Sequence, residues 1–165
     1  MFRGMRRSKQ ELSLEETLDI VKKGKTGVLA VLGDEGYPYT VPINFVYEDN
    51  KLYFHGAKTG HKIDSIKSCG KVSLCVVERD DVVEAELTTY FRSAVVFGRA
   101  RVLEGDEEIA HAARLLGLKY GGDGPAVEQE IEKVWKALCC VEIVIEHITG
   151  KEAIELTRAR ADGHS

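Results

Sequence analysis

The residues best suited to chemistry stand close together in the stretch YFHGAKTGHKIDSIK, residues 53–67. Its pattern predicts the end of a strand, a short glycine-containing loop and the first turns of a helix. The first N–H groups of a helix lack partners within the helix, and the helix dipole is positive there, so such a junction favours an anion. Thr59, His61 and Lys62 would add hydrogen-bond donors and positive charge. On these residues alone, a plain helix start with solvated charges remains an equally open interpretation.

This candidate anion site differs from the common nucleoside triphosphate loop. That loop has the spacing G-x-x-x-x-G-K-[ST], in which the final hydroxyl binds magnesium. In GAKTGHKI the glycines are closer together, His61 stands before the lysine, and Ile63 replaces the hydroxyl residue. A nucleoside triphosphatase is therefore disfavoured, whereas a phosphate held without a metal is compatible with the stretch.

Two side chains beside the anion site are candidates for contact with a ligand. His55 shares a strand face with Tyr53, and a histidine, with an ordinary pKa near ~6.5, can donate a hydrogen bond or a proton. It could equally be a packing or ligand-contacting histidine without a proton role. Asn44 lies on the same face as Pro42, and its amide could bind a ligand or simply face solvent. Pro42 cannot donate to a strand ladder, so it predicts an edge or a split in the sheet where a planar molecule could lie.

The remaining histidines and the four cysteines do not form a metal-binding pattern. No histidine stands at ligand spacing from a cysteine or carboxylate, and the cysteines contain no C-x-x-C motif. We expect no metal site. The cysteines at 75, 139 and 140 lie in apolar runs, so we interpret them as buried thiols in preference to a redox pair.

Composition places the chain among globular proteins. It has 165 residues, of which 44% are hydrophobic and 30% charged, and a formal net charge of -4. This charge argues against nucleic-acid binding, and no apolar run approaches the roughly 20 residues that span a membrane. The start MFRGMRRSKQELS lacks the apolar core of a secretory signal, so we expect a cytoplasmic protein.

Hydrophobic periodicity and turn residues predict the secondary structure. Helices are expected over residues 14–24, 63–68, 106–119 and 127–138, and strands over 26–32, 37–48, 51–56, 71–78, 88–105 and 139–150. Ser13 should cap the first helix, and Gly98 should mark a bend in the longest strand. The run ERDD, residues 78–81, is interpreted as a solvated loop. Trp135 is expected to pack in the core or at an interface between subunits.

Strands joined by tight turns pair in antiparallel fashion, and this many strands in a short chain favour a closed or nearly closed barrel. We expect a mainly β fold, with peripheral helices around the barrel. The predicted organisation is an N-terminal arm at residues 1–12, a single domain at 13–154 and a disordered tail at 155–165.

Three motifs, in this order, resemble a known family: Y-x-V-P-x-N at residues 39–44, Y-F-H-x-A-x-x-G-H-K at 53–62, and V-F-G-R-A-R-V at 96–102. Together they resemble the FMN-binding split barrels of the pyridoxamine 5'-phosphate oxidase superfamily, and within it most of all the 5-nitroimidazole-resistance, or nitroimidazole reductase, proteins. The resemblance covers residues 5–154. It implies an antiparallel Greek-key barrel of about six strands, forming a homodimer with FMN at the subunit interface.

The resemblance also implies which residues bind FMN. His61 and Lys62 match the basic pair that grips the phosphate, together with Thr59 in the same loop. Val41, Pro42, Ile43 and Asn44 match the strand that runs beside the isoalloxazine ring. His55, Gly56 and Ala57 match the end of the strand beside the flavin. Arg92 and Ser93 match the position from which the partner subunit reaches the flavin. His55 is the one candidate for a catalytic role. The sequence differs from pyridoxamine 5'-phosphate oxidase itself in two respects. His61 stands where that enzyme has an arginine, and the C-terminal motif with which that enzyme binds pyridoxal phosphate has no counterpart here.

The function implied by the resemblance is an FMN-dependent oxidoreductase that passes electrons from a reduced nicotinamide cofactor to a small organic acceptor. Two alternatives stay open at this point. One is a flavin or haem carrier or sensor without turnover, and the other is a deazaflavin-dependent reductase on the same barrel.

Overall fold

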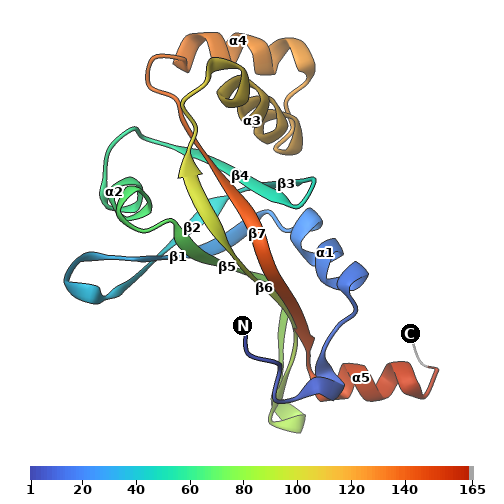
Figure 1. Ribbon diagram of the computed structural model, residues 1–165. Coiled ribbons are helices and arrows are strands. Elements are labelled where there is room, and N and C mark those ends of the chain that lie inside the picture. Colours follow the sequence, from blue (N-terminus) through green and yellow to red (C-terminus); the bar gives the residue numbers. More distant parts are fainter. Residues whose placement is uncertain (164–165) are drawn as a thin grey trace.

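The structure is a computed structural model that describes residues 1–163 (Figure 1). Seven strands form one antiparallel sheet: β1 (Thr26–Leu32), β2 (Pro38–Asn44), β3 (Val46–Glu48), β4 (Lys51–Gly56), β5 (Lys71–Val83), β6 (Thr88–Val102) and β7 (Cys139–Glu152). Five α-helices accompany the sheet: α1 (Leu14–Lys23), α2 (His61–Ser68), α3 (Asp106–Lys119), α4 (Gly124–Val134) and α5 (Ile154–Ala161). Short 3-10 turns occupy Ser8–Gln10, Asp34–Gly36 and Glu84–Glu86. None of the helices within residues 1–163 is long and apolar enough to span a membrane.

The sheet closes on itself as a split barrel. Its strand order is β2-β1-β5-β6-β7-β4-β3, so β2 and β3 lie at opposite ends of the order. Only Phe45 separates these two strands in the chain, which brings the two ends of the sheet together, and β2 also contacts β4. The predicted antiparallel β class is confirmed. The single strand expected over residues 37–48 is divided at Phe45, which gives seven strands where about six were expected.

The barrel interior is filled by one apolar cluster. Its fully buried members come from all parts of the sheet and from α1 and α2, and include Ile20, Leu29, Phe45, Leu52, Phe54, Ile63, Leu74 and Ile143. A second cluster lies between the outer side of β4 and the helices α3 and α4, and contains Val46, Tyr53, Ala112, Leu116, Val127 and Ile131. Trp135 packs against this second cluster. In Figure 1 the α3–α4 pair accordingly sits at one end of the molecule, beyond β3 and β4.

Several local predictions are confirmed. Ser13 forms a capping box with Glu16 at the start of α1, where the Glu16 amide donates to the Ser13 hydroxyl at 3.2 Å. The pairing of β6 with β7 shifts register between Phe97 and Gly98. A methyl group on Gly98 would overlap the carbonyl oxygen of Val144, so the neighbouring strand passes too close for any other residue.

Three predictions are corrected. The run at 78–81 is not a loop, because β5 continues to Val83 and pairs with β6 as a two-stranded arm. The helix expected from residue 127 begins at Gly124, since the Asp123 side chain accepts from the Ala126 amide at 2.8 Å and caps it earlier. The tail expected to be disordered contains α5, which begins directly after β7. Residues 164 and 165 of that tail lie outside the described residues.

Candidate functional site

Strand β2 supplies an open sheet edge. It pairs with β1, with Pro42 opposite Val28 and Asn44 opposite Thr26, and no other strand of residues 1–163 pairs with its second edge. Pro42 has no N–H, so it must occupy a position whose backbone faces away from β1. By strand alternation the backbone groups of Thr40 and Asn44 face away from β1 too. The edge expected from Pro42 is therefore present, with backbone donors and acceptors along it.

The side chains of β2 alternate between the barrel interior and its surface. Val41 packs against the core and Ile43 is buried, whereas Pro42 and Asn44 are exposed. A ligand lying along this edge would therefore meet the Asn44 amide and the backbone, while Val41 and Ile43 support the strand from inside.

Strand β4 ends at the second part of the site. After His55 and Gly56, the exposed residues Ala57 and Thr59 form a short loop that leads into α2. Gly60 precedes the helix with φ 122°, a conformation that favours glycine. No side chain within residues 1–163 caps α2, so its first amides point outward at the positive end of the helix dipole.

The two basic residues at the start of α2 have different surroundings. The Lys62 ammonium lies 5.3 Å from the centre of the Phe54 ring, and a Cβ on Gly56 would be 3.4 Å from it. Lys62 thus folds back over the end of β4, and it forms no ion pair with a carboxylate of the described residues. A cation without a carboxylate partner, beside free helix amides, is a suitable arrangement for an anion.

His61 connects α2 to the β1–β2 turn. Its ring stacks on Tyr39 of β2, with centroids 4.2 Å apart, and its Nε2 atom accepts from the Asp34 amide at 3.3 Å. Because Nε2 is an acceptor, the proton of the neutral ring lies on Nδ1. His61 therefore positions the helix start on β2, and can meet an anion through its backbone amide and Nδ1–H. Tyr39 was missed in the sequence, although it stands in the first of the three motifs.

A cavity of about 500 Å³ connects the strand ends with the helices α3 and α4. Asn44, His55 and Gly56 line one side of it, and α3, α4 and the turn after α4 line the other. His55 is exposed and stands opposite Cys140 of β7 in the ladder. The structure thus brings the predicted residues of β2, β4 and α2 together in one chain.

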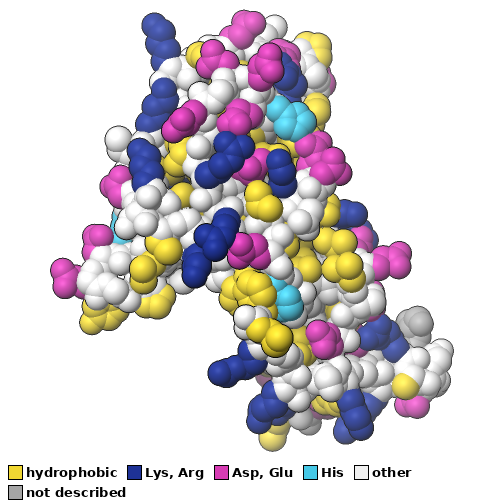
Figure 2. All heavy atoms as spheres, in the orientation of Figure 1, with side chains coloured by type: hydrophobic (Ala, Val, Ile, Leu, Met, Phe, Trp, Pro, Cys, Tyr) yellow, Lys and Arg dark blue, Asp and Glu magenta, His cyan; other side chains and the backbone are white. Residues whose placement is uncertain are grey.

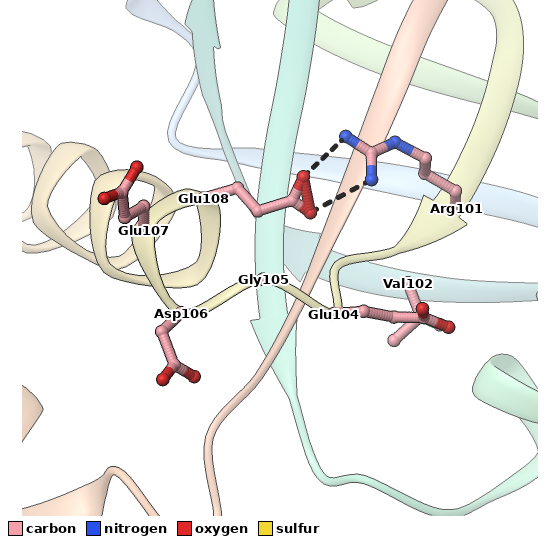
Figure 3. A pocket seen from close by; sticks show the side chains of 7 residues that line it. All are labelled: Arg101, Val102, Glu104, Gly105, Asp106, Glu107 and Glu108. Atoms are coloured by element: carbon pink, nitrogen blue, oxygen red, sulfur yellow. Dashed lines mark hydrogen bonds and ion pairs between the residues drawn. The ribbon is translucent and has the colours of Figure 1, made fainter.

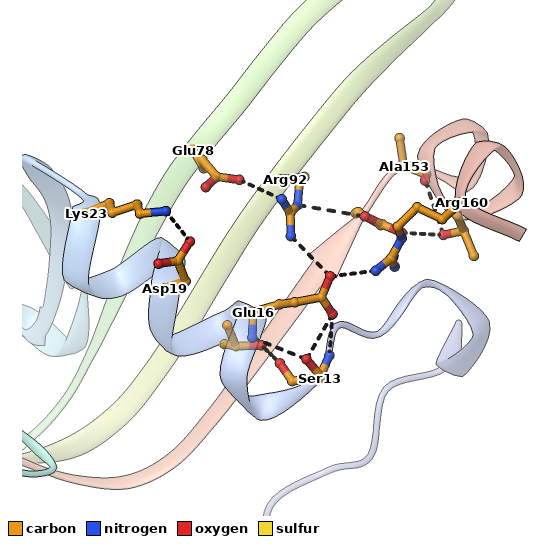
Figure 4. A network of polar contacts seen from close by, with 11 residues as sticks. Ser13, Glu16, Asp19, Lys23, Glu78, Arg92, Ala153 and Arg160 are labelled. Atoms are coloured by element: carbon orange, nitrogen blue, oxygen red, sulfur yellow. Dashed lines mark hydrogen bonds and ion pairs between the residues drawn. The ribbon is translucent and has the colours of Figure 1, made fainter. Parts of the chain in front are cut away.

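Arg92 and Ser93 lie elsewhere in the same chain. Arg92 forms ion pairs with Glu16, Glu78 and Glu152 at 3.5, 3.3 and 3.7 Å (Figure 4). Strand alternation places it toward α1, on the opposite face from Ser93. Ser93 faces the outer surface of the sheet and Arg92 does not, and the expectation that this position reaches the flavin of a partner subunit stays a prediction.

Tyr120 and Lys119, at the end of α3, were also missed. The Phe45 amide donates to the Tyr120 hydroxyl at 2.9 Å, and Lys119 donates to the carbonyl oxygens of Gly24 and Phe45 at 2.5 and 2.7 Å. Burial lowers the pKa of Lys119. These side chains provide hydrogen-bond partners for backbone groups where the chain passes from β2 to β3. They thereby hold the end of α3 beside the split. Aromatic and basic residues at a helix end carry no signal of such distant contacts.

A charged cluster surrounds Glu142 on β7, whose side chain is 5% exposed. Lys51 and Arg101 each donate to it at 2.9 Å. Burial alone would raise the pKa of Glu142, but these hydrogen bonds outweigh it and hold the pKa below its usual range. Figure 3 shows that Arg101 also donates two hydrogen bonds to Glu108 at the start of α3. Each member of the cluster is paired, so we interpret it as structural; a glutamate within the apolar run CCVEIV was the signal for it.

No group of three or more histidine, cysteine or acidic side chains within residues 1–163 is placed to hold a metal ion. The four cysteines are unpaired, and burial raises the pKa of the Cys140 thiol to about 12.

Known proteins of similar sequence or structure identify the family to which this fold belongs. A model of the family described as pyridoxamine 5'-phosphate oxidase matches residues 13–152. A candidate 5-nitroimidazole antibiotic resistance protein from Bacteroides thetaiotaomicron has a TM-score of 0.70 at 24% identity, over 92% of this chain and 90% of its own. An FAD-binding protein from Mesorhizobium loti has a TM-score of 0.63 at 23% identity, over 87% and 97%. An FAD and heme binding protein from Mycobacterium smegmatis has a TM-score of 0.68 at 19% identity, over 88% and 73%.

No curated protein matches the chain. Identities as low as those of the solved structures show a shared fold and nothing further. The family match, however, extends from the cap of α1 to the end of β7 and includes every strand of the barrel. The chain belongs to the pyridoxamine 5'-phosphate oxidase family.

Proposed function

We propose that this protein binds FMN in the split of its barrel and acts as an oxidoreductase. One observation carries the proposal: the uncapped start of α2 contacts β2 through His61 and β4 through Lys62, beside the free edge of β2. The matching relatives include proteins named for FAD binding, which supports a flavin as the ligand. A phosphate monoester fits the start of α2 well, and this favours FMN.

The phosphate would lie at the first amides of α2. Gly60 leaves open space there, since a Cβ on it would meet no atom within 4 Å. The helix dipole, the backbone N–H groups and Nδ1–H of His61 would all favour negative charge. Lys62 can leave the Phe54 ring to pair with the phosphate, because its long side chain is flexible and forms no ion pair within the described residues.

The ring system would lie along the free edge of β2. Backbone groups of Thr40 and Asn44 face this edge, and the Asn44 amide adds a donor and an acceptor. His55 and Gly56 approach from the end of β4. These groups would hold the polar edge of the ring, and the split would provide the space for it.

A bound flavin supplies the redox chemistry, accepting electrons from a reduced nicotinamide and passing them to a small organic acceptor. The chain would orient both partners and limit the access of water. His55 is the side chain we propose beside the acceptor, where it would donate a hydrogen bond or a proton. The name of the Bacteroides thetaiotaomicron relative makes 5-nitroimidazoles the first acceptors to try.

We propose further that two copies pair through the outer face of the sheet. Pro42, Val28, Cys75 and Val95 form a row across β2, β1, β5 and β6 by their ladder positions. Val28 is 42% exposed and the nearby Val77 is 55% exposed. Figure 2 shows hydrophobic side chains gathered around the middle of one face, with charges of both signs around them. Ser93 borders this row, so it would approach the flavin of the partner copy.

The four unpaired cysteines favour a reducing compartment. We therefore propose the cytoplasm as the location of the protein.

The phosphate assignment is tested by titrating the protein with FMN and with riboflavin, which lacks the phosphate. One charge-assisted hydrogen bond contributes about 1.5–3 kcal/mol, so Lys62→Ala should weaken FMN binding by about 10- to 100-fold. The same variant should leave riboflavin binding unchanged. Lys67→Ala, a substitution in the last turn of the same helix, is the matched control and should leave both affinities unchanged.

Equal affinities of the unaltered protein for FMN and riboflavin would contradict the phosphate site. Absence of binding by either flavin would contradict the proposed function altogether. If the FMN-loaded protein binds flavin tightly but does not oxidise NADH in the presence of 5-nitroimidazoles or quinones, the carrier role replaces the enzymatic one.

A further inference from the structure

The cavity between the barrel and the α3–α4 pair has a composition unlike that of the flavin site. Its walls on the helical side are formed by apolar side chains, among them Leu116, Val127, Ile131 and Leu138. At about 500 Å³ it lies within the usual range of small-molecule sites. It opens toward Asn44 and His55, which also border the free edge of β2. We refer to it as the α3–α4 cavity.

The α3–α4 cavity contains almost no charge. Glu130 is its one acidic side chain and forms an exposed ion pair with Lys133 at 3.2 Å, and none of the lysines or arginines of residues 1–163 lines the cavity. Lys119 lies nearby in sequence, but its ammonium donates to the carbonyl oxygens of Gly24 and Phe45. An anion in this cavity would lose its hydration without gaining a lysine or arginine as its partner, and the Glu130 carboxylate at the rim would not favour it.

The helices on either side of the cavity are held in a fixed arrangement. A Cβ on Gly117 would lie 2.7 Å from Val127, so α3 and the start of α4 approach as closely as only glycine allows. Gly121, with φ 101°, turns the chain between the two helices. Tyr120 ties the end of α3 to Phe45 beside the split. The cavity is thus a defined space between anchored walls.

We propose that the α3–α4 cavity binds the substrate of the flavin site, and that it selects uncharged aromatic molecules over anionic ones. The apolar walls would cover the faces of the ring, while His55 would hydrogen-bond to its polar substituent. This proposal rests on the proposed function, because the cavity opens to the place where the flavin ring would lie. It excludes phosphate esters and carboxylates as preferred substrates of this protein.

Two probes of the same shape separate the charge from the apolar surface. 2-Naphthamide is neutral and 2-naphthoate is an anion at neutral pH, and binding of each to the full-length FMN-loaded protein is measured by calorimetry. We expect naphthamide to bind at least about tenfold more tightly than naphthoate, a difference of roughly 1.4 kcal/mol. Glu130→Gln should improve naphthoate binding and leave naphthamide unchanged.

Substitutions at the rim of the cavity locate the bound probe. Ala126 and Ala137 line the cavity and are exposed, so Ala126→Trp and Ala137→Trp fill it without disturbing the core. Each should weaken naphthamide binding by at least about tenfold. Gln129→Trp places the same side chain on α4 away from the lining, and should have no effect. FMN affinity should stay the same in all three variants.

The outcomes separate this inference from the proposed function. If FMN binds but naphthamide does not, or if naphthoate binds as tightly, the inference is wrong and the flavin assignment stands. If Gln129→Trp weakens naphthamide binding as much as Ala126→Trp and Ala137→Trp do, the inference is also wrong. If FMN fails to bind, the proposed function is wrong, and a substrate role for the cavity is wrong with it.

Discussion

The Tyr120 hydroxyl hydrogen-bonds to the backbone at the split in the barrel, and Tyr120→Phe should reveal its contribution to stability. At Phe45 the chain leaves its pairing with β1 and begins its pairing with β4, so the backbone of this buried residue has no ladder partner. The Phe45 amide donates to the Tyr120 hydroxyl at 2.9 Å. Its carbonyl oxygen accepts from Lys119 at 2.7 Å. The single proton of the Tyr120 hydroxyl faces the carbonyl oxygens of Lys25 at 2.5 Å and Phe45 at 2.9 Å. Removal of the hydroxyl therefore leaves the Phe45 amide without an acceptor, whereas the Phe45 carbonyl keeps Lys119 and water can reach the exposed Lys25.

The expected loss follows from this difference. One buried donor without a partner costs about 1–3 kcal/mol of unfolding free energy. For a domain of this size, 1 kcal/mol lowers the melting temperature by about 2–4 °C. Tyr120→Phe should therefore lower it by roughly 2–12 °C, and urea unfolding should show a matching fall in midpoint with an unchanged slope.

Tyr37→Phe provides the control, because Tyr37 is 74% exposed at the β1–β2 turn. It should unfold as the unaltered protein does. If the unfolding free energy of Tyr120→Phe is also within about 0.5 kcal/mol of that of the unaltered protein, the hydroxyl is not needed as the acceptor for the Phe45 amide, and the reasoning is refuted.

Two further predictions concern stability. Glu142→Gln should lower the unfolding free energy at neutral pH by about 1.5–3 kcal/mol, because two charge-assisted hydrogen bonds lose their anion. The pKa of Glu142 is lowered in the folded protein, so its contribution is present above the unfolded value near ~4.3 and is lost as the pH falls through the lower folded value. The difference between the two proteins should thus shrink on acidification, and a constant difference in urea unfolding between pH 7 and pH 3 would contradict this account. Gly98→Ala should destabilise by about 1–3 kcal/mol, since the new methyl group meets the Val144 carbonyl oxygen. Gly124→Ala meets no atom within 4 Å and should be neutral or slightly stabilising; equal stabilities of the two variants would show that β7 can move aside at Gly98.

Local chemistry explains which features could be predicted from the sequence. Ser13 and Glu16 act within one turn of helix, and Pro42 acts through its own missing N–H, so each predicts its structure without knowledge of the fold. Gly98 likewise marks a close approach through its missing side chain. The positions of the barrel strands and of the α2 junction follow from such signals.

The features that could not be predicted depend on contacts between distant segments. The role of Tyr120 becomes visible only when α3 lies against Phe45, and the ion pairs of Arg92 join α1, β5 and β7. The division of residues 37–48 into two strands depends on which neighbour each half pairs with. The α3–α4 cavity is a space between elements, for which periodicity within one element gives no signal.

The central claim is that the phosphate of FMN binds at the start of α2 while its ring lies along β2. A crystal structure of the FMN-loaded protein tests this most directly. The account predicts the phosphate at the amides of His61 and Lys62, with the ring beside Pro42 and Asn44 and one FMN in each chain. A flavin whose phosphate lies away from α2, or whose ring does not touch β2, would contradict it.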